Sequence, residues 1–324
     1  MKKGFFRDNL IYFVLFTAIL LQAVDYFYAG NNNEYNTFYT QGIEPNFVLT
    51  GYNDKTIPTE EELLSGKSNI EIFNYYVENQ TYIMHAGGEI NGINYTNSYD
   101  ALDTNYKKGN RIFEIDLNFT SDDHLVLVHG WTKYDYKNRL GIEYDSDNLV
   151  MSLNDFKNSL LHNKYQTMSI EDLINFMKSH PYSYFILNLK KGSKESVSLK
   201  GLKQIVKVAN NDSSILNRLV IWGYNTKIIS LAKKIYNFEL ITFSYNSPDS
   251  MPKKVNTKKK IIAYCKKNNI TSLIYSISSF DEEMAKLANE AGIYSFVFTT
   301  DKEEVAKSYL NKGASMVLTN KLKN

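Results

Sequence analysis

The stretch "IFEIDLNFTSDDHLVLVHG" (residues 112–130) combines an apolar run, a turn, a second apolar run and a histidine. In its first part Glu114 and Asp116 are separated by one residue. Side chains two positions apart on a strand point to the same face, so the pattern predicts a strand with both carboxylates on one side. The Ser-Asp-Asp turn predicts that residues 125–128 fold back as a hairpin.

Similar short runs, rich in aliphatic and aromatic residues, recur along the chain as predicted strands at 82–85, 112–117, 184–189, 219–222, 239–243, 272–277, 294–298 and 315–319. Stretches with apolar residues at helical spacing lie between them, at 99–107, 170–178, 199–209, 227–235, 258–267, 282–291 and 303–310. Strict alternation implies right-handed crossovers and a parallel sheet. The α/β pattern predicts an eight-stranded parallel (β/α)8 TIM barrel over residues 80–324, with a doubly wound open sheet as the alternative.

The N-terminal part has a different composition. Lys2, Lys3 and Arg7 precede an apolar run, so residues 1–29 are predicted to be a transmembrane anchor or a signal segment. Residues 30–79 are predicted to be an extracytoplasmic spacer, with a helical region at 60–79 that packs near the barrel. The barrel would then lie outside the membrane, anchored or secreted after signal cleavage.

The bulk composition excludes some classes of protein. The chain has 324 residues, and its 37 basic and 35 acidic side chains leave a net charge of +2, which argues against nucleic-acid binding. The single cysteine, Cys265, permits no intrachain disulfide.

Two acidic residues and two histidines are candidates for chemistry. If Glu114 and Asp116 face the barrel axis, they repel each other unless a cation lies between them. Oxygen ligands favour a hard divalent cation, Mg²⁺ or Ca²⁺, over zinc. His85 ends the first strand and His129 ends the hairpin, and such a pair can share general acid and base work. The alternative is a reversed strand, with the acids among the helices.

Aromatic residues near strand ends are candidates for lining a headgroup pocket, although for each residue taken alone barrel packing is the favoured interpretation. Trp222 and Tyr224 are the foremost of them, beside Trp131, Tyr245 and Phe298.

Three segments together resemble the glycerophosphodiester phosphodiesterase family. They are "HAGG" (85–88), "TNSYDALDTNYKKGNRIFEIDLNFTSDDHLVLVHG" (96–130) and, more weakly, "VFTTDKEEVAKSYLNKGASMVLTN" (297–320). The resemblance covers residues 80–320 and implies a TIM barrel. It also implies that His85 and His129 act in acid/base catalysis and that Glu114 and Asp116 bind the metal.

The resemblance places the third metal ligand at Asn188, where the family carries a glutamate, and makes Lys190 face the phosphate. Two further positions depart from the family pattern: Ala86 stands where arginine is usual, and Gly130 where aspartate is usual. These departures are typical of an outlying member near the phosphatidylinositol-specific phospholipases C.

The sequence therefore predicts a metal-dependent phosphodiester hydrolase that releases glycerol phosphate or a related product from a small phosphodiester or lipid headgroup. A phospholipase of the C or D type acting on intact lipid is one alternative. The other is a catalytically reduced barrel that binds a headgroup or glycan.

Overall fold

The computed structural model describes residues 59–147, 149–245 and 257–324. The predicted anchor or signal segment at 1–29 and most of the predicted spacer lie outside these residues. Within the described part, no helix is both long enough and apolar enough to cross a membrane.

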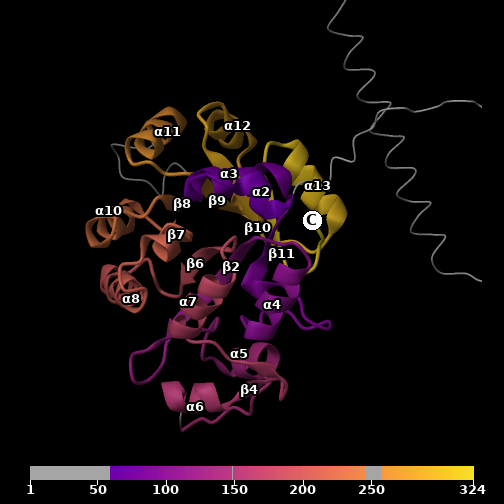
Figure 1. Cartoon of the computed structure of the whole chain (residues 1–324), viewed down its shortest axis with the longest axis vertical. Helices are drawn as coiled ribbons and strands as arrows, with labels where there is room; N and C mark the ends of the chain where they lie inside the picture. The colour runs from indigo at the N-terminus through magenta and orange to yellow at the C-terminus, as the bar shows by residue number, and fades with distance from the viewer. Residues whose placement is uncertain (1–58, 148, 246–256) are drawn as a thin grey trace, which may run out of the picture. The chain divides into compact units, whose positions relative to one another are not determined.

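Eight parallel strands form a closed barrel, seen in Figure 1. They are β1 (Tyr82–Met84), β2 (Ile112–Phe119), β6 (Tyr184–Leu189), β7 (Leu219–Gly223), β8 (Leu240–Ser244), β9 (Ser272–Ser276), β10 (Tyr294–Phe298) and β11 (Met316–Thr319). Strand β1 closes the ring, because Tyr82 is paired with Val317 of β11 and Met84 with Phe113 of β2. The predicted barrel is confirmed, and the open sheet is wrong because β1 has a neighbour on both edges.

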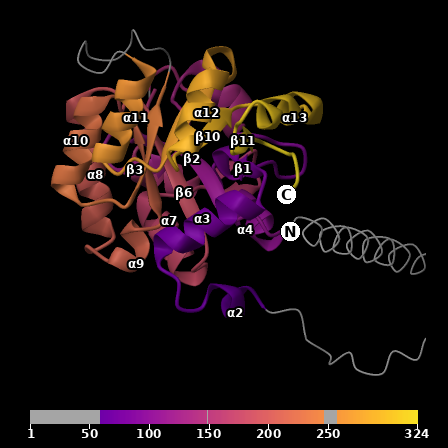
Figure 2. The same cartoon turned by 90° about the horizontal axis from the view of Figure 1, so that it is seen from above.

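The predicted helices surround the strands, and Figure 2 shows α8, α10 and α11 outside them. The helices are α4 (Tyr99–Lys107), α7 (Ile170–Ser179), α8 (Glu195–Val208), α10 (Thr226–Ile235), α11 (Lys258–Lys267), α12 (Glu282–Glu290) and α13 (Glu303–Asn311), with the short α9 (Ser213–Leu216) and η5 (Ile277–Ser279). The strand residues facing them form the larger apolar core, which includes Phe113, Ile115 and Leu117 of β2.

The alternate residues of the strands point into the barrel. Ile112 of β2 and Tyr184 and Ile186 of β6 belong to a separate interior cluster. Glu114 and Asp116 have the same parity as Ile112, so both carboxylates lie on the interior face. The reversed orientation of β2 is therefore wrong.

Two helices that precede β1 close one end of the barrel. They are α2 (Glu60–Leu64) and α3 (Asn69–Asn79), each started by a capping box. Phe73, Tyr76 and Val77 of α3 join the interior cluster at the strand beginnings. The Tyr184 hydroxyl donates to the Asn69 carbonyl at 2.8 Å. The prediction that this helical region packs near the barrel is confirmed, and the compact unit runs from Thr59 to Asn324.

The substitution Phe73→Ala tests how much α3 stabilises the barrel. Phe73 is fully buried, with its ring 5.4 Å from that of Tyr184. Losing it should cost about 3–5 kcal/mol and lower Tm by about 10 °C. Leu63→Ala, at a position 42% exposed on α2, is the matched control and should leave Tm nearly unchanged in the same calorimetric scan. Equal Tm values for the two variants would contradict this role of α3.

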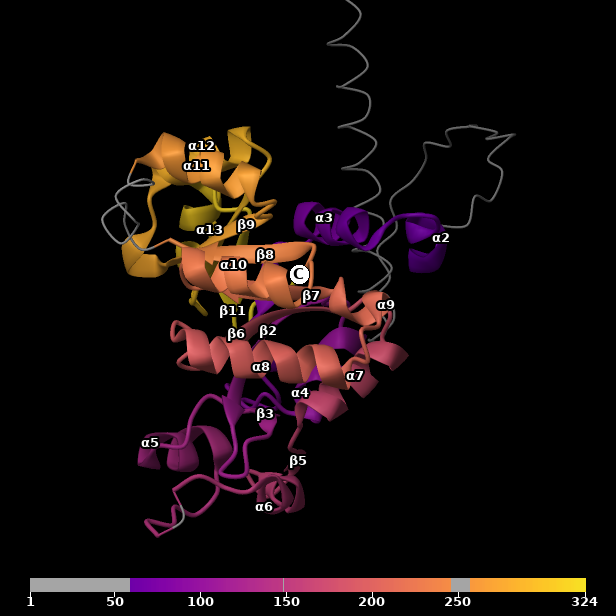
Figure 3. The same cartoon turned by 90° about the vertical axis from the view of Figure 1, so that its left-hand side faces the viewer.

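A long insertion follows β2 and builds a separate lobe. It contains β3 (Leu125–Leu127), α5 (Lys133–Asp135), η2 (Tyr136–Leu140), α6 (Leu153–Asn158), β4 (Leu160–Leu161) and β5 (Tyr165–Gln166). Strand β3 pairs antiparallel with β2, which confirms the predicted hairpin. The lobe has its own apolar cluster, with Tyr136 and Phe156 at its centre. Figures 1 and 3 show α5 and α6 at the side of the barrel away from α11 and α12.

Candidate active site

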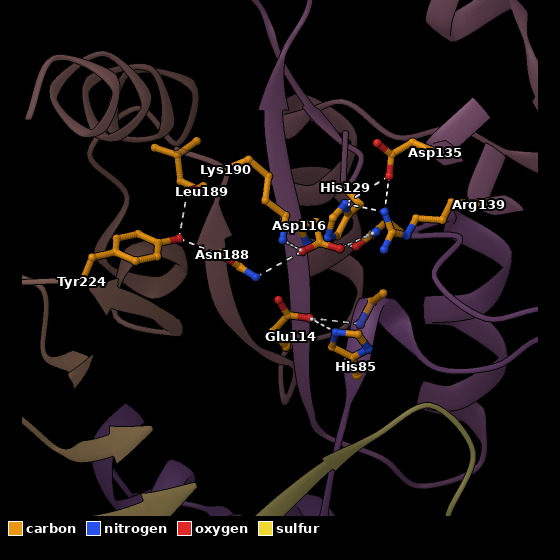
Figure 4. Close-up of polar contacts among 12 residues, drawn as sticks. His85, Glu114, Asp116, His129, Asp135, Arg139, Asn188, Leu189, Lys190 and Tyr224 are labelled. Atoms are coloured by element: carbon orange, nitrogen blue, oxygen red, sulfur yellow. Dashed lines mark hydrogen bonds and ion pairs between the residues drawn. The ribbon is translucent and has the colours of Figure 1, made fainter. Parts of the chain in front are cut away.

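The two carboxylates of β2 lie fully buried inside the barrel (Figure 4). Glu114 Oε2 accepts a bond of 3.1 Å from the Ala86 N–H, whereas Oε1 has no hydrogen-bond partner among the described residues. Burial, together with the charge of Asp116, raises the pKa of Glu114. Burial is the largest cause and acts to raise the pKa of Asp116 as well, but the Lys190 ammonium, 2.5 Å from Oδ1, and the charges of His85 and His129 together hold this pKa below its ordinary value. The pKa values of Glu114 and Asp116 are thus shifted in opposite directions.

His85 lies at the carboxyl end of β1, in the short turn η1 (His85–Gly87), and is 9% exposed. Its Nδ1 is 2.9 Å from Asn320 Oδ1, and its Nε2 is 3.7 Å from Glu114 Oε2. Asn320 follows β11 and is itself held by Asp301, to which its Nδ2 donates at 2.8 Å. A residue from the last strand therefore orients a histidine of the first.

His129 follows β3 and is brought to the same end of the barrel. Its Nδ1 lies 3.1 Å from Asp135 Oδ1 and 2.7 Å from Arg139 Nη1, and Arg139 also pairs with Asp135. Burial is the largest cause that lowers the pKa of His129; the charges of Lys190 and Arg139 act in the same direction, against those of Asp116 and Asp135.

Tyr95 separates the two histidines. Its ring centroid lies 4.6 Å from that of His85 and 6.4 Å from that of His129, edge-on to both. The Arg139 guanidinium covers the Tyr95 ring at 5.0 Å. The predicted pair of histidines therefore shares one site, with an aromatic wall and a cation from the insertion.

Asn188 lies beside Asp116 on the neighbouring strand β6. Its Nδ2 donates to Asp116 Oδ1 at 3.2 Å, and its Oδ1 accepts from the Tyr224 hydroxyl at 2.9 Å. That hydroxyl also lies 2.8 Å from the Leu189 carbonyl. The Asn188 oxygen thus faces Tyr224, and the amide would have to turn over to place it among the carboxylates. Its role as a metal ligand stays a prediction.

Trp222 and Tyr224 lie next to each other at the end of β7. Trp222 is 6% exposed and belongs to the interior cluster, with its ring stacked 5.9 Å from that of Tyr224. Burial and the charges of Glu114 and Asp116 raise the pKa of Tyr224 well above its ordinary value, so its hydroxyl is protonated. The contacts show packing for Trp222 and a hydrogen bond to Asn188 for Tyr224, and their substrate contacts stay predictions.

Sequence reasoning gave no individual role to four site residues: Asn97, Asp135, Arg139 and Asn320. Asn97 precedes α4 and makes two hydrogen bonds with Asp116. Its Nδ2 donates to Asp116 Oδ2 at 3.2 Å, and its Oδ1 accepts from the Asp116 N–H at 2.9 Å. The Asn-Ser pair before a helix was an available signal for Asn97. Asp135 in α5 and Arg139 in η2 are four residues apart, a spacing too common in sequences to single them out.

The structure also shows the surroundings of Ala86 and Gly130, the two residues that depart from the family pattern. Ala86 is fully buried in a left-handed conformation (φ 50°), and its N–H is bonded to Glu114. At Gly130 an added Cβ would lie 2.5 Å from Asp135 Oδ2. The carboxylate of Asp135 therefore occupies the space that a side chain at position 130 would need.

Glu114 and Asp116 are the acidic side chains of the site that could bind a divalent cation. No three His, Cys, Asp or Glu side chains within the described ranges are grouped so that they could hold a metal ion. Glu114 and Asp116 are nevertheless both buried on one face, and the unpartnered Glu114 Oε1 is the kind of oxygen that a cation would satisfy. The two carboxylates fit a hard cation, with fewer protein charges than three acids would supply.

The chain shares its fold, a TIM barrel, with several solved structures. It is similar to a glycerophosphodiester phosphodiesterase from Parabacteroides distasonis, at 16% identity and a TM-score of 0.58 over 75% of this chain and 93% of that one. A protein from Galdieria sulphuraria, described as a glycerophosphodiester phosphodiesterase, is 17% identical and has a TM-score of 0.57 over 74% of this chain and 93% of that one. A phosphodiesterase from Oleispira antarctica is 16% identical and has a TM-score of 0.56 over 74% of this chain and 93% of that one. A search of curated proteins finds no match.

The sequence itself decides the family. The profile of the glycerophosphoryl diester phosphodiesterase family matches residues 85–324, from the first histidine to the end of the chain. The chain belongs to the glycerophosphoryl diester phosphodiesterase family and is an enzyme of that family.

Proposed function

We propose that this chain hydrolyses glycerophosphodiesters in a reaction that depends on a divalent cation, releasing glycerol phosphate. The observation that carries the proposal is the pair of buried carboxylates on β2, with Glu114 Oε1 unpartnered among the described residues and with His85 and His129 at the same end of the barrel. The similar phosphodiesterase from Oleispira antarctica is described in complex with the product sn-glycerol-3-phosphate, which supports this substrate class.

Glu114 and Asp116 would hold the cation, Mg²⁺ or Ca²⁺, and Asn188 could add its side-chain oxygen after turning over. When bound, the cation would polarise a phosphodiester oxygen. Lys190, which forms an ion pair with Asp116, would face the same phosphate. The stacked rings of Trp222 and Tyr224 would form the wall of the substrate pocket on the β7 side.

We assign the role of general base to His85. The Asn320 amide donates to Asp301 through Nδ2, which leaves its Oδ1 turned to His85 Nδ1. An amide oxygen only accepts, so Nδ1 of His85 carries a proton and the neutral ring has its lone pair on Nε2. Nε2 is the nitrogen on the Glu114 side, where it would take a proton from the attacking hydroxyl.

His129 is then the general acid. A protonated His129 would give its Nε2 proton to the departing alkoxide, and a negative group behind Nδ1 favours the protonated ring. Asp135 provides that group at 3.1 Å.

An assay of the full chain in mild detergent tests the proposal. We expect hydrolysis of glycerophosphocholine and glycerophosphoethanolamine with Mg²⁺ or Ca²⁺, and loss of activity with chelator. Activity that resists chelation would contradict the cation role of Glu114 and Asp116. Faster turnover of intact phosphatidylinositol than of either glycerophosphodiester would favour a phospholipase instead.

One observation favours a catalytically reduced binding barrel as the second candidate. Lys190 and Asn188 both contact Asp116 Oδ1, and these donors occupy an oxygen that a metal would use. If no substrate is turned over under any metal condition, but glycerol phosphate raises Tm, the binding function would replace the enzymatic one.

We also propose that the barrel acts outside the membrane. The basic residues before the apolar run 10–24 favour retention of the N-terminus inside. In cell fractionation the full chain should stay with membranes after alkaline extraction, and a form beginning near residue 30 in the supernatant would favour a cleaved signal.

A further inference from the structure

We propose that Asp135, supplied by the insertion after β2, is the positioning residue that orients the His129 ring. This inference rests on the proposed role of His129 in acid/base chemistry. It adds a residue that does not lie on a barrel strand.

The Asp135 carboxylate is held rigidly at both oxygens. Its side chain is 4% exposed, and Oδ2 accepts from the Thr132 N–H at 3.0 Å and from the Thr132 hydroxyl at 2.6 Å. Oδ1 is directed to His129 Nδ1 at 3.1 Å and to Arg139. The capping box of a three-residue helix thus aims one oxygen at the histidine.

Gly130 makes this approach possible. Its backbone conformation is not one that requires glycine, since its φ lies outside the left-handed range. A Cβ at this position would nevertheless lie 2.5 Å from Asp135 Oδ2 and 3.1 Å from its Cγ. Glycine is therefore needed for space, and the space that it leaves is filled by the carboxylate that faces His129.

Arg139 shows why the carboxylate is the partner that matters during the reaction. A guanidinium only donates, so Arg139 can bond His129 Nδ1 only when that nitrogen carries no proton. When the ring is doubly protonated, Nδ1–H needs an acceptor, and Asp135 Oδ1 is the acceptor within reach. Asp116 and Asp135 favour the charged ring, whereas Lys190 and Arg139 oppose it.

The test uses the full chain labelled with ¹⁵N-histidine, and the ring ¹⁵N shifts of His129 are followed against pH. In Asp135→Asn we expect His129 to titrate about one pH unit lower, because a negative charge beside the ring is lost. Gly130→Ala should shift His129 in the same direction without changing residue 135, because its Cβ displaces the carboxylate. Asp145→Asn is the matched control: it removes a carboxylate from an exposed position of the same insertion, and it should leave both Tm and the His129 titration near those of the wild type.

Activity provides the second readout. Asp135→Asn should lower kcat roughly 10- to 100-fold, the range of a lost hydrogen bond to a charged group, with little change in KM. His129 ring shifts identical to those of the wild type in both Asp135→Asn and Gly130→Ala would overturn the inference, whatever the activity. A wild-type chain that shows the expected ring shifts but hydrolyses no phosphodiester would support the Asp135 contact and refute the proposed function.

Discussion

His129→Ala and His85→Ala are each expected to lower kcat for glycerophosphocholine by about 10²–10⁴-fold, because each removes a group that moves a proton in the transition state. Tm should change little for His129→Ala, since its side chain is 32% exposed. The measurement is steady-state kinetics with Mg²⁺, beside a thermal scan of each variant.

The leaving group separates the two roles. A glycerol phosphodiester with a p-nitrophenyl group needs no protonation when it departs, so His129→Ala should lose much less activity on it than on glycerophosphocholine. His85→Ala should be equally impaired on both, because both need the attacking hydroxyl to lose its proton. The reverse pattern would exchange the two roles.

His124→Ala is the matched control for these variants. His124 lies on the same hairpin, and its side chain is 42% exposed beside Asp122. Activity should stay within about twofold of the wild type. If His124→Ala and His129→Ala had the same activity, His129 would have no catalytic role.

Glu114→Gln is the second variant with a large expected effect, and it should change activity and stability in opposite directions. Activity should fall by about 10²-fold or more, because one of two cation-binding carboxylates is lost. In chelator, at a pH above the raised pKa of Glu114, the variant should be more stable than the wild type, since a neutral amide then replaces a buried charge beside Asp116.

The difference in stability between Glu114→Gln and the wild type should depend on pH. Glu114 has a pKa raised above its ordinary value of about 4.5, so the folded state binds this proton more tightly than the unfolded state does. Its stabilising contribution is complete below pH 4.5 and is lost as pH rises through the raised pKa. The Tm advantage of Glu114→Gln should therefore grow from pH 4.5 upward.

Addition of Mg²⁺ should reduce the difference in Tm between Glu114→Gln and the wild type, because it should raise the Tm of the wild type and leave that of the variant nearly constant. Glu61→Gln, at an exposed position on α2, should follow the wild type throughout. A Tm for Glu114→Gln in chelator that stays below that of the wild type across the whole pH range would show that the buried carboxylate is satisfied without a cation.

Much of the barrel and part of the site follow from local patterns. The alternation of apolar runs with helical stretches defines eight repeats, and each predicted strand lies within about two residues of its position in the structure. Glu114 and Asp116 share a face because a strand has a period of two, which holds in any fold. The Asp-Asp turn likewise brings β3, which leads to His129, alongside β2.

Contacts between distant segments could not be predicted in this way. Asn320 reaches His85 across 235 positions, and Asn69 meets Tyr184 across 115, only because the barrel closes and α3 covers its end. The orientation of the Asn188 amide depends on the Tyr224 hydroxyl, which comes from another strand.

By itself the sequence determined the alternation of strands and helices, the shared face of Glu114 and Asp116, and the two histidines at strand and hairpin ends, because these depend on periodicity and on turns. The closure of the strands into a barrel depends instead on the pairing of β1 with both β11 and β2. Only the tertiary structure decided which partners those side chains have. Asp135 and Arg139 lie in α5 and η2, whose positions are set by the packing of the insertion, and the carboxylate comes to lie beside Gly130 only once this segment has folded against His129.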